Sequence, residues 1–116
     1  MPRPDRYNIL FLNTDQQRWD TLGCYGSAVA RTPNLDRLAA EGARLTNFYT
    51  ASPTCTVSRA SLLTGRVPQR HGLTYQLPGI EGNYGVGLDQ DEVIIPRMLA
   101  PAPYATGCFG KWNIGF

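Results

Sequence analysis

The sequence lacks a strong excess of charge of either sign. Its 11 Lys and Arg residues nearly balance nine Asp and Glu residues, and the formal net charge is +2 at pH 7. The basic residues are scattered, with no stripe and no interleaved aromatic platform. We therefore expect no nucleic-acid partner, because nucleic-acid-binding proteins concentrate positive charge on one surface.

Long hydrophobic runs are also missing. The N-terminal segment passes directly into an apolar run at residues 7–12. This run is far too short to cross a membrane and too short for the core of a signal peptide. With no signal peptide evident, the sequence predicts a cytoplasmic protein without a membrane partner.

Cysteine and histidine are both scarce. The three cysteines cannot all pair with one another, and none of their spacings is typical of a metal site. Cys24, in a glycine-flanked loop, and Cys108, in an apolar segment, are expected to be inert, with Cys108 packing as a small hydrophobic residue. The single histidine, His71, is expected to be a surface or loop residue rather than a catalytic base.

What remains is typical of one small globular domain. The 116 residues are 42% hydrophobic and 17% charged, enough for one modest core. Apolar runs predict strands at residues 7–12, 43–49 and 104–109, and start and stop signals predict helices at residues 32–42 and 91–99. The Gly- and Pro-rich residues 73–90 are predicted to be irregular. Strands alternating with helices predict an α/β fold with a parallel sheet, here the front end of a larger fold.

One segment, from Cys55 to Arg66, predicts anion chemistry. A helix beginning near Ser58 would direct its free N–H groups and positive dipole end towards Cys55. Arg59 adds a planar, charged side chain that suits a tetrahedral oxyanion. Gly65 is a natural helix terminator.

This segment resembles the signature of the type I sulfatases, which reads Cys-x-Pro/Ala-Ser-Arg followed by Thr-Gly-Arg. Six positions match in register: Cys55, Ser58, Arg59, Thr64, Gly65 and Arg66, while Val57 stands where the family has Pro or Ala. The resemblance implies that a maturation enzyme oxidises Cys55 to formylglycine, the catalytic nucleophile. It also implies the fold of the alkaline phosphatase superfamily, a mostly parallel sheet flanked by helices. Residues 1–116 would be an incomplete, N-terminal part of that catalytic domain.

A second feature, the pair Asp15-Gln16, follows the predicted strand 7–12. A carboxylate beside a carboxamide at a strand end suits a hard divalent cation, although an isolated Asp can also simply cap a turn. The surrounding block resembles the opening of many sulfatases, where two adjacent residues bind calcium. The resemblance implies that Asp15 and Gln16, together with the modified Cys55, bind Ca²⁺ or another divalent cation.

A third feature, Gly-Lys-Trp-Asn at residues 110–113, follows the predicted strand 104–109. It resembles the family's Gly-Lys-Trp-His-Leu-Gly block, which implies that Lys111 contacts both the sulfate and the formylglycine. Asn113 takes the place of the family's histidine at the substrate site. Asparagine can donate a hydrogen bond but cannot transfer a proton near neutral pH.

The resemblance implies a sulfuric ester hydrolase, similar to arylsulfatases or choline sulfatases, that acts on a small sulfate ester. The aldehyde hydrate would attack sulfur in line, with Arg59 and Lys111 stabilising charge, and would then expel sulfate as the aldehyde reforms. Two alternatives stay open. One is a phosphonate monoester or phosphodiester hydrolase of the same superfamily, and the other is a non-catalytic, truncated remnant. In each case we expect the isolated chain to be inactive.

Overall fold

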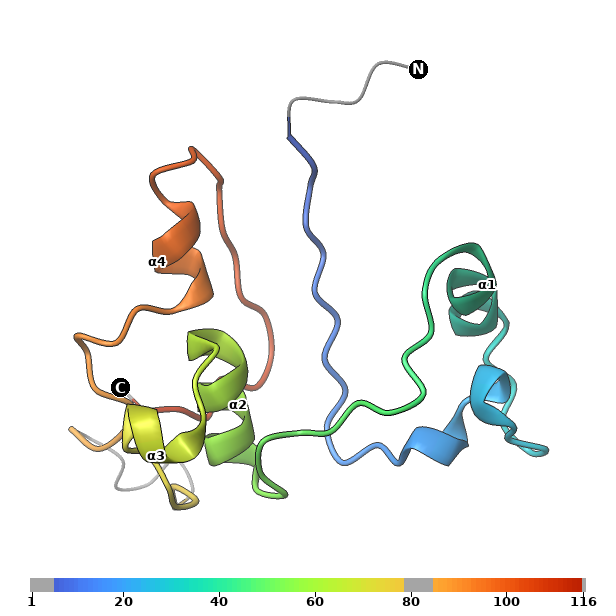
Figure 1. Cartoon of the computed structure of the whole chain (residues 1–116), viewed down its shortest axis with the longest axis horizontal. Coiled ribbons are helices and arrows are strands. Elements are labelled where there is room, and N and C mark those ends of the chain that lie inside the picture. The colour runs from blue at the N-terminus through green and yellow to red at the C-terminus, as the bar shows by residue number, and fades with distance from the viewer. Residues whose placement is uncertain (1–5, 79–84, 116) are drawn as a thin grey trace. The chain divides into compact units, whose positions relative to one another are not determined.

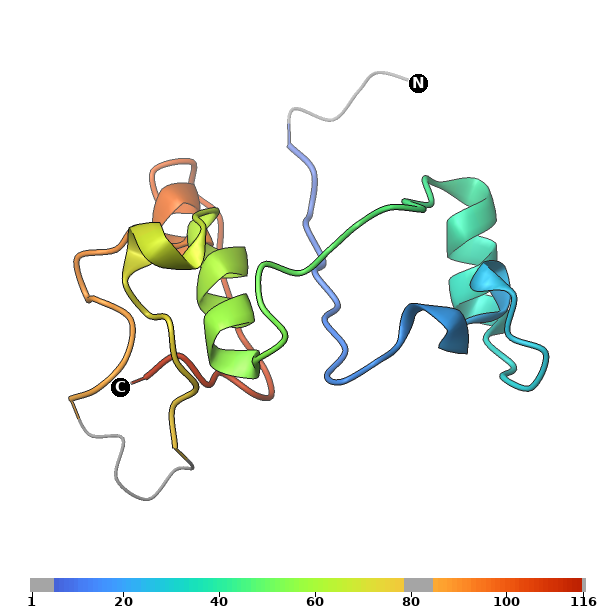
Figure 2. The ribbon, with the colours of Figure 1, turned by 60° about the horizontal axis from the view of Figure 1, so that its bottom comes forward.

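The computed structural model describes residues 6–78 and 85–115. The chain divides into two compact units, Met1–Thr46 and Asn47–Phe116 (Figures 1 and 2). In the part of the chain that the structure describes, no helix has the length and apolar character needed to span a membrane.

The first unit contains two short 3-10 helices, η1 (Trp19–Thr21) and η2 (Gly23–Tyr25), and one α-helix, α1 (Pro33–Glu41). The predicted helix at residues 32–42 is therefore confirmed. Pro33 occupies its first turn, and Gly42 closes it with an N–H bond to the carbonyl of Leu38. Thr32 precedes α1 without capping it through its side chain, and its hydroxyl accepts a hydrogen bond from the Gly23 N–H at 2.8 Å.

The second unit contains α2 (Cys55–Thr64), α3 (Pro68–His71) and α4 (Ile95–Leu99). Helix α2 starts at Cys55 rather than near Ser58, because the extended Thr54 already provides the first helical acceptor, for the Ser58 N–H. Gly65 ends α2 in the left-handed conformation at φ 66°, as predicted. Helix α4 is shorter than the predicted 91–99, since its helical turns begin only beside Pro96.

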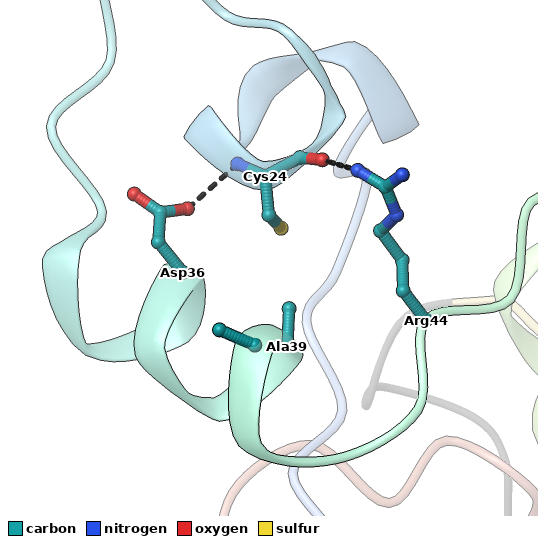
Figure 3. Close-up of a pocket in the computed structure, with 5 residues that line it drawn as sticks. Cys24, Asp36, Ala39 and Arg44 are labelled. Atoms are coloured by element: carbon teal, nitrogen blue, oxygen red, sulfur yellow. Dashed lines mark hydrogen bonds between the residues drawn. The ribbon is translucent and has the colours of Figure 1, made fainter.

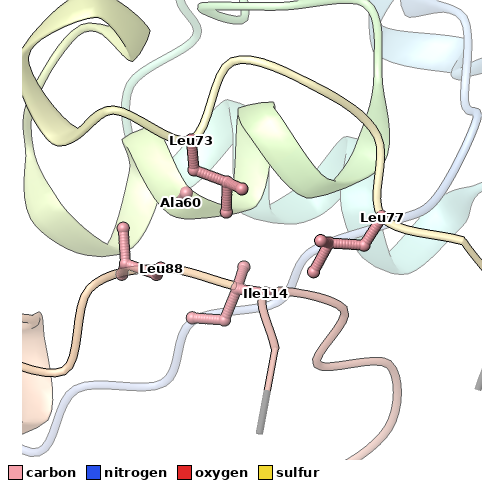
Figure 4. Close-up of a cluster of buried hydrophobic side chains, with 5 residues drawn as sticks. All are labelled: Ala60, Leu73, Leu77, Leu88 and Ile114. Carbon is pink, nitrogen blue, oxygen red and sulfur yellow. The ribbon is translucent and has the colours of Figure 1, made fainter. Parts of the chain in front are cut away.

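The core of the second unit joins α2 to the C-terminal segment. Five buried hydrophobic residues form one cluster (Figure 4): Ala60, Leu73, Leu77, Leu88 and Ile114. The Leu88 N–H donates to the Ile114 carbonyl at 2.8 Å, next to an antiparallel bridge between Gly87 and Gly115. A side chain at residue 115 would begin 2.5 Å from the Cα of Gly87, and φ there is +103°, so this close approach requires glycine.

The predicted parallel sheet is not confirmed. Within the described residues, segments 7–12, 43–49 and 104–109 form no strand ladder, and the isolated Gly87–Gly115 bridge is the sole β pairing. Their apolar side chains are largely exposed, as at Leu10 (83%) and Phe109 (97%). A strand needs a neighbouring strand for its backbone groups and a covering layer for its side chains, and the described residues of these segments show neither a strand ladder nor a buried side chain. Residues 73–78 and 85–90 are irregular as predicted, and residues 79–84 lie outside the described part.

Candidate active site

Cys55 is the first residue of α2 and is half-buried. The chain enters the helix through a polar turn in which the Ser52 hydroxyl accepts from the Thr54 N–H at 3.2 Å. The side chain of residue 55 thus projects from the positive end of a ten-residue helix. This position favours a group that carries or develops negative charge.

Arg59 lies one turn after Cys55 and therefore on the same face of α2. Its guanidinium donates from Nη1 to the carbonyl oxygen of Lys111 at 2.6 Å. The structure thus brings together two of the predicted blocks, which are 52 residues apart. It places the exposed Lys111 beside the helix that carries Cys55.

Asn113, the fourth predicted site residue of this unit, contacts the first turn of α2. Its Oδ1 accepts from the Thr56 hydroxyl at 3.2 Å and from Nε2 of Gln76 at 3.2 Å. Oε1 of Gln76 in turn accepts from the Thr56 N–H at 3.1 Å, which satisfies one of the free N–H groups at the helix start. Asn113 has φ +56°, a conformation that asparagine tolerates better than most residues.

Sequence reasoning missed Gln76 because no local pattern marks it. It lies in an irregular segment, and its partners are 20 and 37 residues away along the chain. Only the folding of that segment against α2 gives its carboxamide a role.

Asp15 and Gln16 lie in the first unit and are exposed. Their carboxylate and carboxamide oxygens are donors that calcium accepts, so the chemistry of the pair fits the expected cation. The number of ligands falls short, since no three His, Cys, Asp or Glu residues of the described chain cluster in a way that could hold a metal. The described residues alone therefore do not complete a cation site.

The expectation that His71 is a surface or loop residue is wrong. His71 ends α3 and is only 5% exposed. Its Nδ1 accepts from the Leu73 N–H at 3.2 Å, so the ring hydrogen lies on Nε2, 3.0 Å from the Ser61 hydroxyl. Burial lowers the pKa of His71 below 6.5; the charge of Glu92 opposes this and that of Arg66 reinforces it. The imidazole thus joins α2 to α3 in its neutral form.

The two other cysteines, Cys24 and Cys108, differ in how far they are exposed to solvent. Figure 3 shows the half-buried Cys24 with its thiol facing a cavity of about 290 Å³, which Asp36, Ala39, Ala40 and Arg44 also line. None of the predicted site residues lines this cavity, and the Arg44 guanidinium beside it donates to the Cys24 carbonyl. Cys108 is exposed, so the prediction that it packs as a small hydrophobic residue is wrong.

Comparison with known proteins assigns the class. A family model for sulfatases matches residues 7–116, and the chain belongs to the sulfatase family. It is 48% identical to arylsulfatase A of Bos taurus over 93% of this chain and 21% of that protein. It is 42% identical to N-acetylgalactosamine-6-sulfatase of Homo sapiens, over 97% of this chain and 22% of that protein. It is 43% identical to steryl-sulfatase of Mus musculus, over 98% of this chain and 19% of that protein.

The chain thus spans about a fifth of the length of these curated relatives. Membership of the family implies the alkaline-phosphatase-like α/β fold, although the described residues do not form its sheet. The expected cytoplasmic location is wrong, because the similar sulfatases are lysosomal or ER-resident proteins. The first residues of a chain that covers so little of its relatives were not a sound basis for that prediction.

Proposed function

We propose that residues 1–116 are the N-terminal part of a sulfatase catalytic domain, and that this part supplies the nucleophile of a sulfuric ester hydrolase. The observation that carries the proposal is the 2.6 Å bond from Arg59 to the Lys111 carbonyl. It joins the block that contains Cys55 to the block that contains Lys111 and Asn113. The names of the relatives, all sulfatases, favour sulfate esters over phosphonate or phosphate esters.

In this proposal the positively charged side chains of Arg59 and Lys111 stabilise negative charge at and near residue 55. Arg59, on the same face of α2, stabilises negative charge on the nucleophile, while the Lys111 ammonium stabilises charge on the transferring group. Asn113 contributes a hydrogen bond to the substrate and takes no part in proton transfer.

Two further components belong to the proposal. A maturation enzyme converts Cys55 to formylglycine, whose hydrated aldehyde supplies a nucleophile that can later release sulfate. Asp15 and Gln16 bind Ca²⁺ or another divalent cation together with further ligands that the described residues do not assemble. Because so few metal ligands are assembled, we expect the 116-residue chain alone to show no appreciable turnover.

Peptide mass spectrometry of residue 55 tests the proposal. The chain would be produced with and without a formylglycine-generating enzyme, with Cys55→Ser as the matched control. We expect a thiol-to-aldehyde mass change only when that enzyme is present, and none in Cys55→Ser. If the Cys55 thiol stays unmodified while a reference sulfatase peptide is converted in the same cells, the proposal that residue 55 supplies a formylglycine nucleophile is wrong.

A further inference from the structure

Three residues form a closed hydrogen-bond ring at the start of α2, through two carboxamides and both the backbone N–H and the hydroxyl of Thr56. The Thr56 N–H donates to Gln76 Oε1, Gln76 Nε2 donates to Asn113 Oδ1, and the Thr56 hydroxyl donates to the same Oδ1. The hydroxyl also accepts from the Leu77 N–H at 3.2 Å, so its hydrogen is directed to Asn113. Thr56 is fully buried, whereas Gln76 is exposed.

The orientation of both carboxamides follows from one obligatory donor. A backbone N–H can only donate, so Gln76 must turn its oxygen to Thr56 and its NH₂ group to Asn113. Asn113 must then present its oxygen to the ring. Among the residues that the structure describes, its Nδ2 has no acceptor, which leaves a group that can only donate.

We propose that Gln76 is a positioning residue that fixes the Asn113 NH₂ group as a hydrogen-bond donor for the oxyanion of the substrate. The inference rests on the proposed function, since Asn113 follows Lys111 by two residues in the substrate-binding block. An NH₂ group fixed in this way donates at any pH, whereas a histidine at this position would gain and lose a proton.

The ring can be altered without touching the core. Gln76 is exposed and contributes nothing to the buried cluster around Ile114, which is 1% exposed. Gln76→Glu keeps an oxygen for the Thr56 N–H but removes the donor to Asn113. Asn113 then donates its own NH₂ to the new carboxylate and turns its oxygen outward, which repels an oxyanion.

The test is a titration of the ¹⁵N-labelled 116-residue chain with inorganic sulfate, followed by NMR of the side-chain NH₂ groups. In the unsubstituted chain, sulfate should shift the Asn113 NH₂ signals. Gln76→Glu should weaken sulfate binding at least tenfold while the Thr56 amide stays protected from hydrogen exchange. Gln69→Glu is the matched control, because it makes the same charge change at an exposed position of α3 and should bind sulfate within about twofold of the unsubstituted chain.

Gln76→Ala provides a second variant, in which Thr56 amide exchange should become roughly fivefold faster, the factor expected for one neutral hydrogen bond. Equal sulfate binding by Gln76→Glu and Gln69→Glu would overturn the proposal, as would an unprotected Thr56 amide or an unshifted Asn113 NH₂ in the unsubstituted chain. Failure of the proposed function gives a different result, an unmodified Cys55 thiol, and can be recognised whatever the titration shows.

Discussion

Each of the two units of the chain is stabilised internally by a different kind of interaction. Every buried hydrophobic residue in the described structure belongs to the second unit, where α2, the segment after α3 and the C-terminal segment share one cluster. The described residues of the first unit include no buried side chain, and its order depends on hydrogen bonds around Asp36. The residues proposed to bear the nucleophile thus lie on a small core, whereas the proposed metal ligands lie on a segment that lacks one.

The largest difference between the units should appear when matched apolar residues are truncated. Ile114→Ala removes a side chain that is 1% exposed and should lower the free energy of unfolding of the second unit by about 2–5 kcal/mol. Leu10→Ala removes a side chain that is 83% exposed in the first unit and should change stability by less than about 0.5 kcal/mol. Urea unfolding monitored by circular dichroism measures both, and an equal cost would show that the comparison is wrong.

A smaller effect on stability should follow when the hydrogen bonds of Asp36 in the first unit are removed. The Asp36 carboxylate accepts from the Cys24 N–H at 2.7 Å and from the Thr32 hydroxyl at 3.0 Å. Asp36→Ala leaves both donors without their acceptor and should destabilise η2 and α1 by about 1–3 kcal/mol. Faster amide exchange at Cys24 would report this loss. Glu41→Ala, at the exposed end of α1, is the control and should leave Cys24 exchange unchanged.

The smallest effect is a pH dependence confined to the second unit. Burial lowers the pKa of His71, so the unfolded chain binds a proton more readily than the folded chain. The stabilisation from neutral His71 is therefore fully present above pH 6.5 and is lost as the pH falls from 6.5 towards the lower folded pKa. Urea midpoints at pH 7.5 and pH 5 should differ in the unsubstituted chain.

Two variants check the origin of that pH dependence. His71→Gln, which keeps polar atoms near Ser61 but does not titrate, should remove the His71 contribution. Glu92→Gln should increase it, because the charge of Glu92 raises the pKa of His71. An unchanged pH dependence in His71→Gln would assign the effect to other groups.

The same contrast explains what the sequence could predict. The helix at residues 32–42 and the stop at Gly65 were predicted because their signals are local: a proline at the start, and a glycine at each end point. The strands were predicted from apolar composition alone, but a strand also depends on neighbours that the described residues do not supply.

For the site, the motif residues could be predicted and their supports could not. Cys55, Arg59 and Lys111 stand in recognisable blocks, whereas the burial of His71 and the bonds of Gln76 depend on partners distant in sequence. The relation of Asp15 and Gln16 to Cys55 stays a prediction from the family resemblance.

Residue-resolved hydrogen exchange on the 116-residue chain tests the central claim most directly, since it reports the stability of both units in one experiment. The account predicts protected amides in the last two turns of α2 and at Leu88, whose N–H is bonded to the Ile114 carbonyl. It predicts exchange close to the unfolded rate at residues 8–12, whose side chains are exposed. Protection at residues 8–12 that matches or exceeds that of α2 would contradict the claim that, among the described residues, the second unit alone carries a core.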